Sequence, residues 1–129
     1  MTRTHQLGEL QLAIMRVLWV RGEATVAQVH QALEAERGLA LTTIATMLSK
    51  MEKKGIVSHR SEGRLFVYQA EVSEADVSRS MVAELTDRLF EGRASLLVSH
   101  LLSTQEIDSR ELALIRRLIE KHARQGGKR

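Results

Sequence analysis

The sequence predicts a mainly α-helical protein with one small β-hairpin, and three observations support this fold class. Apolar residues recur at intervals of three and four through most of the 129 residues, which is the period of amphipathic helices. Residues 56–60 and 65–68 are instead short runs rich in β-branched and aromatic side chains, and a segment with Gly63 between them indicates a hairpin turn. The chain has no proline, so nothing in it forbids long helices.

The first two helices are indicated by their apolar period and their caps. Apolar residues between positions 10 and 19 form one broad helical stripe, which ends before Gly22. Thr25 and Gln28 then have the spacing of a capping box, in which each side chain accepts a hydrogen bond from a free backbone N–H group. A second helix is therefore expected to begin there. Gly38 is placed to end that helix.

A third helix is predicted over residues 42–54, and its two faces differ in chemistry. The face predicted to be buried carries Ile44, Met47, Leu48 and Met51. The opposite face carries Thr43, Thr46, Lys50 and Lys53. Hydroxyl groups can bond to base edges and lysines can reach phosphates, so this face suits a helix inserted into a DNA major groove. For an isolated helix, a solvated surface with no partner would have the same composition.

The hairpin that follows favours the DNA-binding interpretation. Three helices and a hairpin with basic residues near its tip form a winged helix-turn-helix domain, which we assign to residues 1–71. In such a domain the third helix lies in the major groove, and the hairpin brings Arg60 and Arg64 to the backbone or to the adjacent minor groove. The five histidines have no metal-ligand spacing and are expected to be surface or partly buried side chains; for His59, in this hairpin, contact with DNA when protonated is the alternative. The predicted DNA-binding residues are Thr42, Thr43, Thr46, Lys50, Lys53, Lys54, Arg60 and Arg64.

The distribution of charge agrees with that assignment. The formal net charge is +3, but residues 1–70 carry nine Lys and Arg against six Asp and Glu, whereas residues 71–123 carry seven against ten. Residues 124–129 carry three basic residues and no acidic one, and we expect them to form a flexible basic tail. A local positive region beside an acidic remainder is typical of a nucleic-acid binder.

Residues 72–123 are predicted to form a helical dimerisation domain. Ser73 and Asp108 are placed to cap two helices, with a short apolar helix between them. So many large aliphatic side chains need a cover, and an identical copy supplies one with the twofold symmetry of a palindromic site. The alternative is a helical cap folded on its own DNA-binding domain. The predicted dimerisation residues are Val77, Met81, Leu85, Leu89, Leu97, Leu101, Leu112, Ile115, Leu118 and Ile119.

Several short segments together resemble the penicillinase repressor family, also called BlaI/MecI/CopY, over about residues 7–122. They are Leu7-Gly8-Glu9-Leu10, Val17-Leu18-Trp19, the segment 42–48, Glu52-Lys53-Lys54-Gly55, Glu62-Gly63-Arg64 and Val67-Tyr68. The resemblance implies a dimeric repressor on a palindromic operator, which controls β-lactam resistance or cell-envelope stress genes. It also implies that Thr43, Thr46 and Lys50 are recognition-helix contacts and that Arg64 is the wing contact.

The resemblance further implies how the repressor is inactivated. The family is cleaved at an Asn-Phe bond in its dimerisation region, and the matching position here is His100-Leu101, so the residues differ from those of the family. A membrane sensor protease is the implied partner. The copper-responsive branch of the family uses a cysteine motif, and the chain has no cysteine, so copper sensing through thiolates is excluded.

Other classes of function find little support in the sequence. No glycine-rich phosphate loop, nucleophile elbow or metal-ligand spacing is present, so we expect no enzyme activity, no cofactor and no metal site. The chain shows no signal peptide and no apolar run long enough for a membrane span, which predicts a cytoplasmic protein without membrane insertion. Two alternatives stay open, namely a winged-helix protein-interaction module and a regulator that responds to a small ligand.

Overall fold

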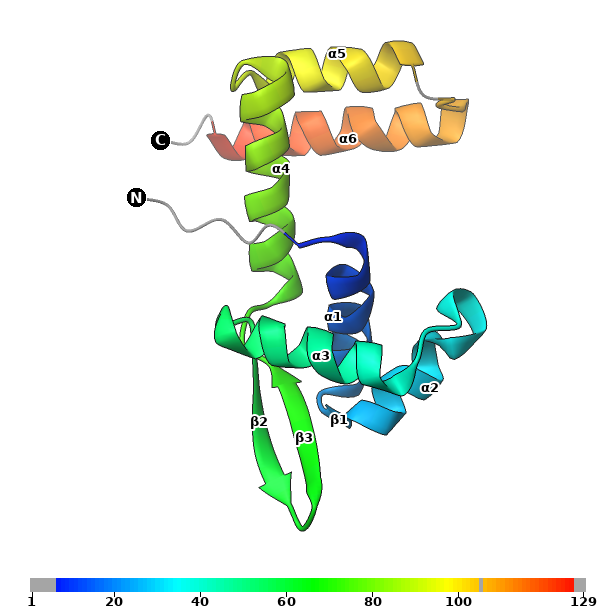
Figure 1. Ribbon diagram of the computed structural model, residues 1–129. Coiled ribbons are helices and arrows are strands. Elements are labelled where there is room, and N and C mark those ends of the chain that lie inside the picture. The colour runs from blue at the N-terminus through cyan, green and yellow to red at the C-terminus, as the bar shows by residue number, and fades with distance from the viewer. Residues whose placement is uncertain (1–6, 105, 127–129) are drawn as a thin grey trace. The chain divides into compact units, whose positions relative to one another are not determined.

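Three helices and a small sheet form the N-terminal part of the protein. The computed structural model describes residues 7–104 and 106–126, and the chain divides into two units, which meet in sequence between Glu84 and Leu85. The N-terminal unit contains α1 (Glu9–Arg21), α2 (Val26–Arg37) and α3 (Leu41–Lys53), followed by β2 (Val57–Glu62) and β3 (Leu65–Ala70). Figure 1 shows β2 and β3 as a hairpin that extends away from the three helices. This is the predicted winged helix-turn-helix arrangement.

The predicted caps of α2 are present in the structure. The backbone N–H of Gln28 donates to Thr25 Oγ1 over 3.2 Å, and the backbone N–H of Thr25 donates to Gln28 Oε1 over 2.9 Å. Gly38 ends the helix in the left-handed region, with φ 56° and ψ 30°, a conformation that glycine adopts without steric cost. The helix-turn-helix is therefore specified by local sequence.

The sheet has three strands, and one of them was not predicted. The strand β1 (Ala24–Thr25) pairs with β3 in antiparallel register, Ala24 opposite Tyr68 and Thr25 opposite Val67, so the strand order is β1-β3-β2. Two residues are too few to show the alternation by which a strand is identified from sequence. The remaining strands extend further than predicted, and the turn between them is the two-residue Gly63–Arg64.

One hydrophobic core holds the N-terminal unit together. The largest fully buried side chains come from all three helices and the sheet: Ile14, Met15, Leu18, Val29, Ile44, Leu48, Met51 and Val57. Trp19 and Met47, both predicted to be core residues, are partly buried against this cluster. The indole N–H of Trp19 also donates to the Val72 carbonyl over 2.9 Å.

The beginning of α4 (Glu74–Phe90) contributes to the same core, which differs from two expectations. Val77 is only 2% exposed and lies in the core cluster, so it is not available to a partner subunit and the dimerisation role predicted for it is wrong. Met81 and Val72 are partly buried against the same cluster. The N-terminal unit accordingly extends to Glu84, beyond the predicted boundary at residue 71.

The C-terminal unit consists of the end of α4, α5 (Ala94–Thr104) and α6 (Ser109–Gly126). The predicted cap at Asp108 is present, because its Oδ1 accepts the backbone N–H of Glu111 over 2.8 Å. The predicted flexible tail is wrong for residues 124–126, which continue α6, while residues 127–129 lie outside the described part of the chain. Across the residues that the structure describes, no helix combines the length and apolar character that crossing a bilayer requires.

Candidate nucleic-acid interface

The exposed face of α3 carries the hydroxyl and ammonium groups that the sequence predicted. Ile44, Leu48 and Met51 are at most 1% exposed and fasten the helix to the core. The side chains on the outer face are all exposed, namely Thr42, Thr43, Thr46, Lys50 and Lys53, and Lys54 follows directly after the helix. Because the inner face is anchored, the outer face presents a rigid row of short polar groups with cations at its C-terminal end.

The wing presents a second cation, at its tip. Gly63 has φ 63°, which suits the first position of a tight hairpin turn where glycine is favoured, and Arg64 is the second residue of that turn. Arg64 is exposed, and no residue of segments 7–104 and 106–126 forms an ion pair with it. Its guanidinium group is therefore free to bind a phosphate.

Arg60 differs from Arg64 in this respect. Its Nη2 lies 3.1 Å from Glu23 Oε1 and 2.8 Å from Glu62 Oε2, so two carboxylates compensate its charge within the chain. These pairs are about half exposed, so each contributes little to stability. The structure thus makes Arg60 a weaker candidate for contacting DNA than the sequence suggested, because binding a phosphate would require it to leave those partners.

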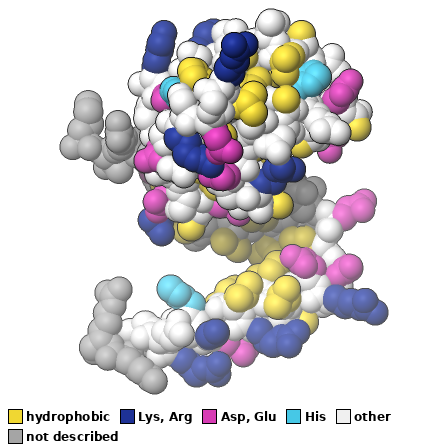
Figure 2. Space-filling model, turned by 90° about the horizontal axis from the view of Figure 1, so that it is seen from below, with side chains coloured by type: hydrophobic (Ala, Val, Ile, Leu, Met, Phe, Trp, Pro, Cys, Tyr) yellow, Lys and Arg dark blue, Asp and Glu magenta, His cyan; other side chains and the backbone are white. Residues whose placement is uncertain are grey.

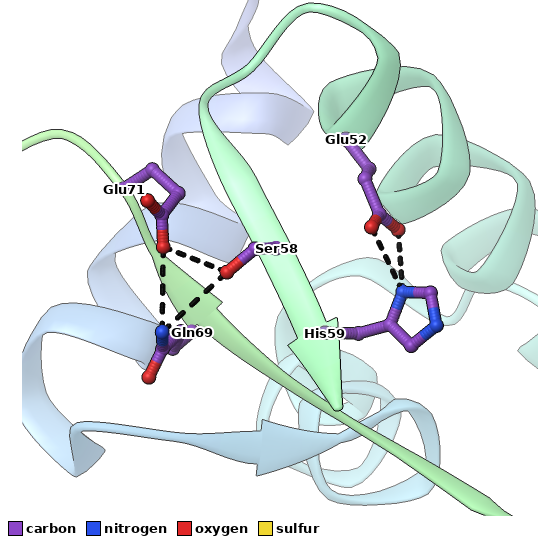
Figure 3. A network of polar contacts seen from close by, with 5 residues as sticks. All are labelled: Glu52, Ser58, His59, Gln69 and Glu71. Atoms are coloured by element: carbon purple, nitrogen blue, oxygen red, sulfur yellow. Dashed lines mark hydrogen bonds and ion pairs between the residues drawn. The ribbon is translucent and has the colours of Figure 1, made fainter. Parts of the chain in front are cut away.

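His59 is partly buried, as expected for the histidines, and its imidazole contacts groups of the protein. Its Nδ1 lies 2.7 Å and 2.9 Å from the two carboxylate oxygens of Glu52, near the end of α3, as Figure 3 shows. Its ring stacks on Phe66 with 4.0 Å between the centroids and 20° between the planes. One face and one nitrogen of the imidazole are therefore engaged within the protein. Sequence reasoning missed this pair, because its only signal is a seven-residue spacing that acquires meaning once β2 folds back beside α3.

Tyr68 lies beside His59 and is 4% exposed. Burial raises the pKa of its phenol above the ordinary value of 10.0, and the neighbouring Glu52 carboxylate raises it further. Tyr68 is therefore neutral at physiological pH, and it serves as an apolar wall at the base of the wing.

A second polar cluster braces the wing where its two strands begin and end. The Ser58 hydroxyl donates to Glu71 Oε2 over 2.7 Å, and the Gln69 amide donates to the same oxygen over 3.3 Å (Figure 3). Ser58 and Gln69 are opposite each other in the β2–β3 register. The cluster therefore joins both strands to the segment that leads into α4.

Exposed aliphatic side chains dominate the C-terminal unit. Neither α5 nor α6 contains a buried residue. In Figure 2, the helix that ends in grey at the lower left, α6, shows hydrophobic side chains along one edge and basic side chains along the other. The large apolar side chains of this unit that are at least 40% exposed are Leu85, Leu89, Val98, Leu101, Leu102, Leu112, Leu114, Leu118 and Ile119. Six of the predicted dimerisation residues are among them, whereas Leu97 and Ile115 are half-buried.

The fold and the exposed face of α3 define the chain as a winged-helix regulator of transcription. The solved DNA-binding domain of the repressor BlaI is similar to it at 33% identity and a TM-score of 0.52, covering 59% of this chain and 93% of that one. The sequence pattern of the penicillinase repressors matches residues 7–121, and the chain belongs to this family.

Individual relatives agree with the family assignment. The penicillinase repressor of Bacillus licheniformis is 26% identical over 95% of both chains. The transcriptional regulator BlaI of Mycobacterium tuberculosis is 37% identical over 89% of this chain and 73% of its own length. A solved structure of monomeric Bacillus licheniformis BlaI in complex with the blaP half-operator is similar at 33% identity with a TM-score of 0.50, over 59% of this chain and 93% of that one.

Proposed function

We propose that the chain is a homodimeric, cytoplasmic repressor that binds a palindromic operator with α3 in the major groove. The observation that carries the proposal is the rigid outer face of α3, where Thr43, Thr46 and Lys50 are exposed while the opposite face is buried. The solved complex of Bacillus licheniformis BlaI with the blaP half-operator supports the binding of operator DNA by this chain. Hydroxyl groups would read base edges, and the cations would hold the backbone.

A titration of duplex DNA tests this function. The DNA is the region upstream of the chain's own coding sequence, the competitor is random duplex of the same length, and the affinity is measured at several salt concentrations. Lys50→Gln should weaken binding, whereas Arg16→Gln removes the same charge from an exposed position on α1 and should not. Equal affinity for operator and random DNA would point instead to a protein-interaction module.

The homodimer is proposed from the apolar surface of the C-terminal unit. A unit whose helices bury no residue of their own lacks the core that isolated domains require, and contiguous exposed aliphatic surface marks an interaction site. A second copy covers that surface and places two α3 helices on one duplex. Sedimentation equilibrium should show a dimer, and a monomer at micromolar concentration would contradict the proposal.

We also propose that an inducing signal acts on the C-terminal unit, with a membrane sensor protease as partner and resistance or cell-envelope stress genes as targets. The peptide bond between His100 and Leu101 lies within α5, and the His100 carbonyl accepts the hydroxyls of Ser103 and Thr104. A protease binds an extended segment, so α5 must open before cleavage, and a helix without buried residues opens at low cost. Mass spectrometry of the chain from induced cells should show a break at this bond. An intact chain released from DNA would favour a small ligand.

A further inference from the structure

The contact between Glu52 and His59 joins the recognition helix to the wing. Glu52 lies in the last turn of α3, and His59 lies in β2, after a connection that turns at Gly55 with φ 82°. The Nδ1 atom of His59 is within 2.9 Å of both Glu52 oxygens, and the two side chains are only 26% and 33% exposed. Partial burial and contact with both oxygens distinguish this pair from an ordinary surface ion pair.

Phe66 extends the contact to the other strand of the hairpin. Its ring stacks on His59, and Tyr68 of the same strand lies 5.4 Å from the His59 centroid. The groups in contact with the imidazole are thus Glu52 from α3 and the rings of Phe66 and Tyr68 from β3. A continuous series of contacts therefore runs from the recognition helix across β2 to β3, and it fixes the tilt of the hairpin against α3.

The negative charge of Glu52 allows two effects of this residue on DNA binding to be separated, namely electrostatic repulsion of phosphates and positioning of the wing. A carboxylate beside Lys50 and Lys53 lies near the surface that phosphates approach, where a negative charge opposes binding. If electrostatic attraction to DNA were all that mattered, removing this charge would strengthen binding. A contribution of Glu52 through the position of the wing has the opposite sign, so the two roles can be separated.

We propose that Glu52 and His59 are positioning residues that hold the wing at the angle required for Arg64 to reach the DNA backbone while α3 occupies the major groove. This inference rests on the proposed operator binding. The wing then acts as a rigid extension of α3 rather than as an independent arm.

Matched substitutions in the full-length chain test the proposal. Glu52→Gln should weaken operator binding by about two- to fivefold, the range expected for weakening one hydrogen bond between partly exposed side chains, although it removes a negative charge. Glu62→Gln removes the same charge from the wing and leaves Arg60 paired with Glu23 alone, so it should leave binding unchanged or strengthen it. His59→Phe keeps a ring beside Phe66 but loses the donor, and its effect should not add to that of Glu52→Gln. Tighter binding by Glu52→Gln, or additive effects, would overturn the inference.

A measurement without DNA separates this inference from the proposed function. Amide relaxation of residues 61–66 should show increased motion of the hairpin in Glu52→Gln but not in Glu62→Gln, while Trp19 fluorescence reports that both variants remain folded. An unchanged hairpin would refute the positioning role even if the operator binds. Increased motion in a chain whose wild type does not prefer its operator would leave the positioning role intact and refute the proposed function.

Discussion

The free guanidinium group at the tip of the wing gives the most quantitative prediction. Replacing Arg64 by alanine removes one phosphate contact from each wing, since no residue in the described ranges pairs with its charge. Each lost contact makes the dependence of log affinity on log salt shallower by about 0.9. For a dimer that uses both wings the change is about 1.8. Between 50 and 200 mM salt, the ratio of wild-type to variant affinity should therefore shrink about 12-fold, or about 3.5-fold if one wing contacts DNA.

Fluorescence anisotropy of labelled operator and labelled random duplex, each at four or more salt concentrations, measures these slopes. Arg64→Ala should weaken both duplexes alike, because a phosphate contact carries no sequence information. Arg79→Ala is the matched control, because it removes the same charge from an exposed arginine that Asp76 already pairs. An unchanged slope for Arg64→Ala, or an equal change for Arg79→Ala, would show that the wing tip does not bind phosphate.

Three further predictions concern base reading, dimerisation and the buried phenol. Thr46→Ala should cost about 1–3 kcal/mol on the operator but little on random duplex, and equal losses on both would remove Thr46 from the base-reading set. Leu118→Asp should lower the fraction of dimer in sedimentation equilibrium. The control Val20→Asp, at an 87% exposed apolar position of the N-terminal unit, should leave that fraction unchanged. A dimer that survives Leu118→Asp would place the interface elsewhere. Because the pKa of Tyr68 is raised, its contribution to folding stability is fully present below pH 10.0 and is lost as the pH rises through the raised value. Phenolate absorbance of this single tyrosine should therefore appear at a higher pH than that of an exposed tyrosine and together with a loss of stability, and phenolate formation at the ordinary pKa would contradict its burial.

Features that depend on local sequence were predictable. The capping box at Thr25, the left-handed Gly38 and the two faces of α3 each follow from residues within one or two helical turns. The resemblance to the penicillinase repressors was likewise visible in short segments, and the family match over residues 7–121 confirms it.

Features that depend on contacts between distant segments were not predictable. The strand β1 exists because two residues before α2 meet β3, more than forty positions later. Val77 belongs to the core because the start of α4 packs on the N-terminal unit, although its helical spacing is equally suited to a dimer surface. Arg60 and Arg64 look alike in sequence, and the positions of Glu23 and Glu62 in the folded chain distinguish them.

The hydrogen bond from Trp19 to the Val72 carbonyl gives the protein a built-in optical probe. Trp19 is the single tryptophan of the chain, and its indole closes a 53-residue interval between α1 and the segment that leaves the wing. A conformational change in that segment, whether caused by operator binding or by cleavage further along the chain, therefore alters the surroundings of one fluorophore. Its emission can be followed in the unlabelled protein, without adding any reporter group.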